Sequence, residues 1–277
     1  KKEKVFYTGS AFRKSYNKKN VVVKQIGMEI FSSKNENIDD KEIIDISFKI
    51  LKSSKYRNSK LNIGNFKLFE LLINKLQIPQ RWKQRLIKFF WNEKYFSELL
   101  KRLESNLDID PVAVAGDKKM YSKMIKLNQK KIINGRSYKE IIKRFESKIN
   151  DPRQSETGKK SAKIIKEFLK IKCSLNNAPN ILNKFFKKYD LNIFVNKDYF
   201  PIKNLKIKDT KFEFSTSIGR GREVEFYNSL IFSLDVKKKN KFVNLISGGR
   251  FDELTSKYLG LKKVPAVGAA VNLSNYE

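Results

Sequence analysis

Residues 246–254 read ISGGRFDEL, and no other stretch says more about the fold. The apolar start predicts a strand, which we expect to break at Gly248-Gly249 before a helix at about 252–259. Glycine lets a ligand approach the backbone closely, and the planar guanidinium of Arg250 suits a phosphate or a carboxylate. Taken alone, the stretch is better explained by a tight turn or a surface salt bridge, so the rest of the chain has to decide.

Three more segments place polar groups on or beside predicted buried strands. Arg13 and Arg222 are further arginines suited to anionic groups. Glu29 suits a cationic group, Gln25 can both donate and accept hydrogen bonds, and Gly268 again leaves the backbone open to a ligand. Only the joint order of the segments points to a binding site. They read FR at residues 12–13 with QIGME at 25–29, REVEFY at 222–227 and PAVGAA at 265–270.

The chain divides into three regions by its pattern of apolar residues. Residues 1–64 mix strand-like and helical segments, residues 65–204 have mostly helical spacing, and residues 205–277 return to alternating strands. An α+β fold accounts for this order most simply: an antiparallel sheet flanked by helices, whose two halves are separated by a mostly helical insertion at 65–204. Because the chain opens with Lys1 rather than Met, we expect that an N-terminal part of the first half is missing.

Local signals set boundaries within these regions. We expect Asp39-Asp40 to begin a helix and residues 151–160 to form a polar linker. Ser137 and Glu140 have the spacing of a capping box, in which each side chain bonds to the backbone N–H of the other residue. A hairpin is predicted from two apolar runs and a lysine-rich turn between them, at residues 224–236, 242–247 and 237–240.

The composition excludes several classes of protein. The 277 residues contain no histidine and one cysteine, Cys173, so an internal disulfide framework is excluded and we expect neither a metal site nor a cofactor. No run of 18 or more apolar residues appears, so we expect no membrane span. A single cysteine fits a reducing cytoplasm.

The formal net charge of +31 has two interpretations. Lysine and arginine supply the salt-dependent part of nucleic-acid affinity, so one interpretation is a polyanionic partner. The other is an A/T-rich genome, since lysine predominates over arginine and occurs with many asparagines and isoleucines. The charge is spread along the chain rather than gathered in one block, which is typical of solvated surface. We favour the second interpretation and do not expect nucleic acid as a partner.

In their joint order, the four segments resemble the class II histidyl-tRNA synthetase family. That family carries an arginine in motif 2 of the class II synthetases. This arginine is followed by the segments Gln-Ile-Gly-x-Glu, Arg-Gly-Leu-Asp-Tyr-Tyr, Gly-Gly-Arg-Tyr-Asp-Gly-Leu and Pro-Ala-Val-Gly. The resemblance implies a class II synthetase-like sheet and places Arg13 at the phosphates of a nucleotide. It also implies a histidine pocket lined by Gln25, Glu29, Arg222, Tyr227 and Gly268.

Three departures from the family pattern argue against an intact adenylating enzyme. The family's Arg-x-Glu becomes Arg13-Lys14-Ser15, which removes a carboxylate that helps to place the adenine ring. The arginine that grips the ATP γ-phosphate is Asn275, a neutral residue that cannot offset phosphate charge. The tyrosine of Gly-Gly-Arg-Tyr is Phe251, which lacks the hydroxyl. By the resemblance, Arg13 is then the remnant of a nucleotide site in a protein that does no chemistry itself.

The predicted insertion resembles one branch of the family, the regulatory subunits of ATP phosphoribosyltransferase from alphaproteobacteria. This implies a non-catalytic subunit that acts in the first step of histidine biosynthesis. It further implies a self-dimer that joins the short-form catalytic subunit in a hetero-octamer and takes L-histidine as its feedback effector. The matching segments read IGNFKLF at 63–69, IPQRWKQRL at 78–86 and GRS at 135–137, with EI at 140–141 and RF at 144–145.

Two other functions stay open at this point. A divergent histidyl-tRNA synthetase would be an enzyme, and Ser15 and Asn275 are the residues that argue against it. Histidine-dependent exchange between ATP and pyrophosphate would reveal such an enzyme. A basic nucleic-acid-binding module would instead bind tRNA with a steep dependence on salt.

Overall fold

The computed structural model describes most of the chain. The described residues are 2–13, 21–31, 35–105, 111–127, 132–133, 135–149, 151, 156–200, 202, 207–221, 225–260 and 262–276. No helix among them has the length and the apolar composition needed to span a bilayer.

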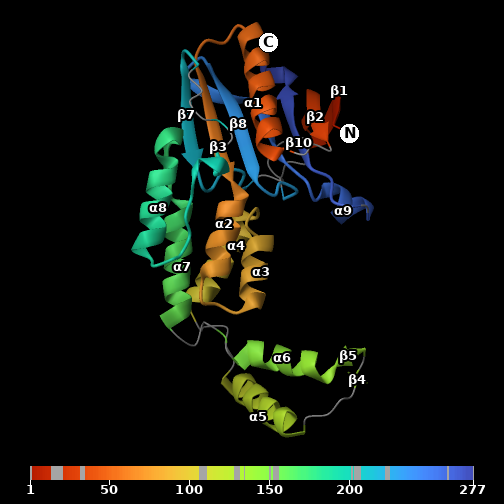
Figure 1. Ribbon diagram of the computed structural model, residues 1–277, viewed down its shortest axis with the longest axis vertical. Helices are drawn as coiled ribbons and strands as arrows, with labels where there is room; N and C mark the ends of the chain where they lie inside the picture. Colours follow the sequence, from red (N-terminus) through yellow and green to blue (C-terminus); the bar gives the residue numbers. More distant parts are fainter. Residues whose placement is uncertain are drawn as a thin grey trace. The chain divides into compact units, whose positions relative to one another are not determined.

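Within these residues, eight strands form one sheet in the order β1-β2-β10-β9-β8-β3-β7-β6 (Figure 1). Neighbouring strands are antiparallel except β3 and β7, which are parallel. A parallel pair needs a long connection, and the chain between these two strands supplies one. The predicted α+β fold class is confirmed, with this one parallel pair in the sheet. The strands are β1 (Glu3–Arg13), β2 (Val21–Phe31), β3 (Ser59–Asn65), β6 (Lys172–Ser174), β7 (Thr210–Ser215), β8 (Leu230–Lys238), β9 (Lys241–Arg250) and β10 (Ala266–Asn272).

One face of the sheet is apolar and is covered by α1 (Glu36–Ser53), which contacts β2, β9 and β10 (Figure 1). The helix buries Ile43 and Phe48, and burial of one such side chain contributes about 1.5–3 kcal/mol. Asn35 caps the helix, because its side chain accepts a backbone hydrogen bond of 3.3 Å from the first turn. The predicted start at Asp39-Asp40 is wrong: both side chains are buried inside the helix and do not cap it.

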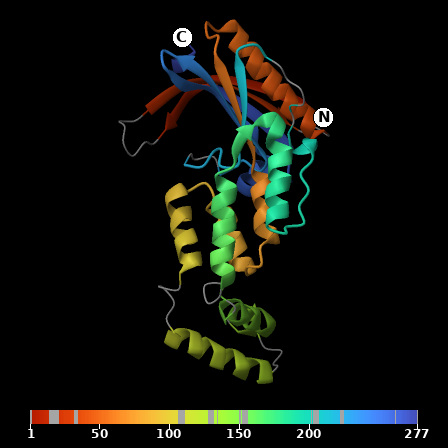
Figure 2. The same cartoon turned by 90° about the vertical axis from the view of Figure 1, so that its left-hand side faces the viewer.

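The opposite face, called the polar face below, carries small and polar side chains. One row across four strands consists of Gly27, Ala270, Ser247 and Ser233, paired in register from β2 to β8. Directly paired residues of antiparallel strands point to the same face. The small side chains of this row therefore leave space on the polar face next to the larger side chains of the same strands. Figure 2, in which the β1–β2 hairpin is red, shows that hairpin at one edge of the sheet.

The chain forms two compact units. The first contains the sheet, α1 and two further helices, and comprises residues 1–71, 168–219 and 223–277. The second is mostly helical and comprises residues 72–167 and 220–222. The helices beyond α1 are α2 (Phe66–Lys75), α3 (Gln80–Lys88), α4 (Glu93–Glu104), α5 (Pro111–Leu127), α6 (Tyr138–Ile149), α7 (Glu156–Leu169), α8 (Ala178–Lys188) and α9 (Leu254–Leu259). The second unit also holds the short strands β4 (Ile132–Ile133) and β5 (Arg136–Ser137).

The local predictions have mixed outcomes. The capping box is confirmed, because Ser137 N donates to Glu140 Oε2 at 2.8 Å and Glu140 N donates to Ser137 Oγ at 3.3 Å. The β8–β9 hairpin is confirmed around the lysine-rich turn, although β8 begins only at Leu230. The linker prediction is wrong from Glu156 onward, since those polar residues form the first turns of the amphipathic helix α7. The expected break at Gly248-Gly249 is also wrong, because β9 continues through both residues.

Candidate functional site

Glu29 on β2 lies in a row that crosses three strands of the polar face. Its register partner is Gly268 on β10, and the partner of Gly268 on the far side is Gly249 on β9. Neighbouring strands are about 4.8 Å apart, so the row extends about 10 Å from Glu29. The sheet beside Glu29 is therefore a floor of two glycines without side chains.

Neighbouring side chains occupy the space above both glycines. A Cβ atom on Gly268 would lie 2.9 Å from Glu29 Cγ and 3.2 Å from a ring carbon of Phe251. A Cβ atom on Gly249 would lie 2.8 Å from Tyr227 Cδ1. The stem of Glu29 and the ring of Tyr227 thus lie against adjacent glycines of one row. Three predicted site residues, Glu29, Tyr227 and Gly268, are brought together here.

Gln25 lies on the same strand and the same face as Glu29, about 13 Å away along β2. Its Nε2 donates a hydrogen bond of 2.8 Å to Tyr7 Oη on β1. The ring of Tyr7 also contacts Gly27, which lies between Gln25 and Glu29. The sequence did not predict Tyr7 as a site residue. Its register partner Gly27 puts Tyr7 on the polar face, and no pattern along the chain marks it as a site residue.

The carboxylate of Glu29 has no partner among the described residues. None of them donates a hydrogen bond to it or forms an ion pair with it. Burial raises the pKa of Glu29 above its ordinary value, because partial removal of water disfavours the charged form. A half-buried acid without a cation is able to bind a cationic group of a ligand.

A second group on the polar face, called the polar cluster below, is bonded to itself. Asp235 accepts hydrogen bonds from Asn62 Nδ2 at 2.7 Å and from Asn244 Nδ2 at 3.0 Å. Asn275 Nδ2 donates to the carbonyl oxygen of Asn244 at 2.8 Å. The side chain of Asn275 therefore closes the edge of this cluster. Its members are Asn62, Ser233, Asp235, Asn244, Ser247 and Asn275.

Arg250 is fully buried in the interior of the first unit. Its Nε donates to Asp40 Oδ1 at 2.9 Å, Nη1 to Asp252 Oδ1 at 2.8 Å and Nη2 to the main-chain oxygen of Glu36 at 3.0 Å. Burial raises the pKa of Asp40 to about 6, although the attraction of Arg250 opposes this. The prediction that Arg250 suits a ligand is wrong, because groups of the chain itself take its donors.

The other two arginines can be placed only in part. Arg13 ends β1 opposite Val21, and its side chain lies outside the described residues. Arg222 lies outside the described residues altogether. Across the part of the chain that the structure describes, no cluster of three or more cysteine or carboxylate side chains could hold a metal ion.

The model of the histidyl-tRNA synthetase family matches residues 1–149, which is more than half of the chain. The chain belongs to that family. The matched part of the chain contains Gln25 and Glu29, together with β1 to β5 and α1 to α6.

Two curated proteins similar to this family member are named ATP phosphoribosyltransferase regulatory subunit. The one from Allorhizobium ampelinum is 28% identical over 234 residues, which cover 78% of this chain and 61% of that protein. The one from Rhizobium johnstonii is 26% identical over 288 residues, which cover 98% of this chain and 76% of that protein. The chain thus spans about three-fifths and three-quarters of their lengths. The resemblance to the regulatory branch, seen in the sequence, is confirmed.

The fold of the family is also confirmed by a solved structure. The crystal structure of histidyl-tRNA synthetase from Nostoc sp. PCC 7120 is similar with a TM-score of 0.54 at 16% sequence identity. The similarity covers 98% of this chain and 52% of that chain.

Proposed function

We propose that this chain is the regulatory subunit of an ATP phosphoribosyltransferase and that it does no chemistry itself. The names of two curated relatives support the first part. The sequences of these two relatives align with 78% and 98% of the chain. In this role it forms a dimer and joins a short-form catalytic subunit in a hetero-octamer. The complex works in the cytoplasm on the first step of histidine biosynthesis.

The observation that carries the proposal is the contrast between Glu29 and the polar cluster. Glu29 has no partner among the described residues, so its carboxylate is available to a ligand. At the position where a synthetase would grip triphosphate, Asn275 is neutral and is bonded to a main-chain oxygen. The polar face therefore suits an amino acid better than it suits a nucleotide.

The amino acid that we propose is L-histidine. Glu29 would accept a hydrogen bond from its imidazole or its ammonium group, and Arg222 would pair with its carboxylate. Gln25 and Tyr227 would contact its remaining polar edges, and Gly268 leaves room for the stem of Glu29 beside the ligand.

Histidine would act through the assembled complex. Feedback requires a coupling free energy between the histidine pocket and the interface with the catalytic subunit. A ligand that binds the polar face in only one state of the complex would shift the complex toward that state.

The test is a reconstitution with the short-form catalytic subunit of a related alphaproteobacterium. Formation of the phosphoribosyl–ATP product is followed with each subunit alone and with both. We expect activity to need this chain and to fall when histidine is added. Glu29→Gln should keep the activity of the complex but lose most of the inhibition by histidine. Glu98→Gln, an exposed acid of α4, is the matched control and should change neither.

Two outcomes would contradict the proposal. One is a catalytic subunit whose activity does not depend on this chain. The other is histidine-dependent exchange between ATP and pyrophosphate by this chain alone, which would make it a divergent histidyl-tRNA synthetase.

A further inference from the structure

Residues 220–222 belong to the second unit, although the chain on both sides of them belongs to the first. Arg220 is flanked by Gly219 and Gly221, whose φ angles of 83° and 73° lie in the left-handed region that glycine adopts readily. The N–H of Gly221 donates a hydrogen bond of 3.0 Å to the main-chain oxygen of Trp91, in the connection between α3 and α4. The backbone beside Arg220 is therefore attached to this connection.

The side chain of Arg220 contacts two aromatic rings at the same place. Its Cζ atom lies 4.9 Å from the centre of the Phe96 ring and 5.7 Å from that of the Phe90 ring. Its Nε donates a hydrogen bond of 3.3 Å to the main-chain oxygen of Phe90. Both rings are buried, so they form a rigid wall for the planar guanidinium. We call these contacts of residues 220 and 221 with residues 90, 91 and 96 the aromatic clamp.

A charged side chain is costly at the position of Arg220. Burial lowers the pKa of its guanidinium, and the attraction of Glu93 opposes this. No carboxylate among the described residues forms an ion pair with Arg220. A leucine or a methionine would cover the two rings without removing a charge from water, so packing alone does not explain an arginine here. What the arginine adds is the hydrogen bond to Phe90, which fixes the direction of the segment.

The residue directly after the aromatic clamp is Arg222, whose own placement lies outside the described residues. In the proposed function its guanidinium pairs with the carboxylate of histidine. Glycine at position 221 gives the chain before Arg222 more conformational freedom than any other residue would. Freedom that a ligand has to remove on binding lowers its affinity. Contacts that hold residues 220 and 221 in advance therefore favour binding.

We propose that Arg220 is a positioning residue, which holds Arg222 where it can pair with the carboxylate of the ligand. This inference rests on the proposed function, because it needs Arg222 in the histidine pocket. Arg220 does not touch the ligand and acts through the backbone of Gly221. The packing of residues 90–96 thereby contributes to the affinity for histidine.

The test is a double-mutant cycle, in which L-histidine is titrated calorimetrically into the complex of this chain with the catalytic subunit. Arg220→Met should weaken histidine binding by about tenfold, near the lower end of what a hydrogen bond to a charged group contributes. Arg222→Met should weaken it at least as much. The double variant should bind no more weakly than Arg222→Met alone, because Arg220 acts through Arg222.

L-histidinol supplies a second readout, because a hydroxymethyl group replaces the carboxylate of histidine. Its affinity should be the same for the native complex and for Arg220→Met. Gly221→Ala is a second variant of the aromatic clamp that keeps both arginines. Alanine rarely adopts a φ of 73°, and its Cβ atom would lie 3.1 Å from Glu93 Oε2. It should also weaken the binding of histidine but not that of histidinol.

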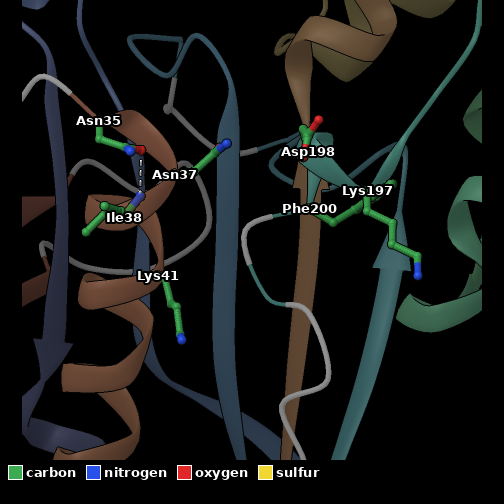
Figure 3. A pocket seen from close by; sticks show the side chains of 7 residues that line it. All are labelled: Asn35, Asn37, Ile38, Lys41, Lys197, Asp198 and Phe200. Atoms are coloured by element: carbon green, nitrogen blue, oxygen red, sulfur yellow. Dashed lines mark hydrogen bonds between the residues drawn. The ribbon is translucent and has the colours of Figure 1, made fainter.

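Two control variants separate positioning from stability and from charge. Arg85→Met removes another arginine of the second unit that lies over an aromatic ring, with its Cζ atom 5.6 Å from the centre of the Tyr95 ring. Lys41→Met removes one positive charge from α1, which covers the face of the sheet opposite to Glu29. Figure 3 shows the side chain of Lys41 extending from this helix beside a cavity of about 330 Å³. Both variants should bind histidine as the native complex does.

The inference is overturned if the native complex binds histidine and Arg220→Met binds it as tightly. It is equally overturned if the two losses add in the double variant, or if Arg220→Met weakens histidinol binding as much as histidine binding. A native complex that does not bind histidine at all would contradict the histidine pocket itself, and this inference with it. The dependence of the catalytic subunit on this chain would still be tested separately by the reconstitution.

Discussion

Two carboxylates on the polar face of one sheet are held in opposite ways. Asp235 accepts hydrogen bonds from two asparagine side chains, at 2.7 and 3.0 Å, and belongs to a cluster closed by Asn275. Glu29 has no such donors among the described residues, and burial raises its pKa. An acid that completes its own hydrogen bonds is part of the structure, whereas one that is left half-buried and unpaired is available to a ligand. The difference separates a closed end of this face from an open one.

The largest effect on stability is expected from the loss of Arg250, the buried cation that pairs with Asp40 and Asp252. Arg250→Met leaves Asp40 and Asp252 buried without their cation. Removing one partner of a buried ion pair costs about 3–5 kcal/mol, so the free energy of unfolding should fall by that amount. Urea denaturation followed by circular dichroism measures it. A variant as stable as the native chain would show that the interior carboxylates need no partner.

A smaller loss is expected where the floor beside Glu29 is filled. Gly268→Ala puts a Cβ atom 2.9 Å from both Glu29 Cγ and Met28 O, and overpacking of this kind costs about 1–3 kcal/mol. Gly116→Ala is the matched control, because nothing lies near its Cβ and alanine favours the helix interior by about 1 kcal/mol. The two variants should therefore shift the denaturation midpoint in opposite directions. Equal shifts would contradict the packing described here.

The closed end of the face should respond next. Asp235→Ala removes the acceptor shared by Asn62 and Asn244. Since the site is partly exposed, we expect a loss of about 1–2 kcal/mol in unfolding free energy. Histidine affinity should change little, because the variant leaves the row of Glu29 intact. A strong loss of histidine binding would mean that the two ends are not separate.

The smallest effect on stability should come from Glu29→Gln, within about 1 kcal/mol. Because the folded pKa is raised, the folded chain keeps this proton at pH values where the unfolded chain has lost it. The native chain therefore loses stability as pH rises through the range above the ordinary glutamate pKa, and the variant does not. Thermal unfolding across pH 4 to 7 should show the variant gaining relative to the native chain. If the variant instead gained stability relative to the native chain as the pH falls, the unpaired state of Glu29 would be contradicted.

The sequence predicted the open end of the polar face better than it predicted the buried side of the sheet. The order of the short segments located Glu29, Tyr227 and Gly268, because each of them belongs to a short motif that resembles the family pattern. Tyr7 was not predicted, since its hydrogen bond with Gln25 depends on the pairing of β1 with β2, which spacing along the chain does not reveal.

Arg250 illustrates why the rest could not be predicted. Its two carboxylate partners are 210 residues away and two residues away, and no local pattern links the distant one to it. The continuity of β9 through Gly248 could not be predicted for the same reason, because it depends on strands that are distant in the sequence. Glycine weakens an isolated strand, but here β8 and β10 on both sides supply the hydrogen bonds that hold it.

Calorimetric titration of L-histidine into the complex with the catalytic subunit tests the central claim most directly. The native chain should bind histidine, Asp235→Asn should bind it about equally well, and Glu29→Gln should lose at least tenfold in affinity, which corresponds to about 1.4 kcal/mol. If Glu29→Gln binds histidine as tightly as the native chain does, the half-buried carboxylate is not the ligand's partner and the account fails.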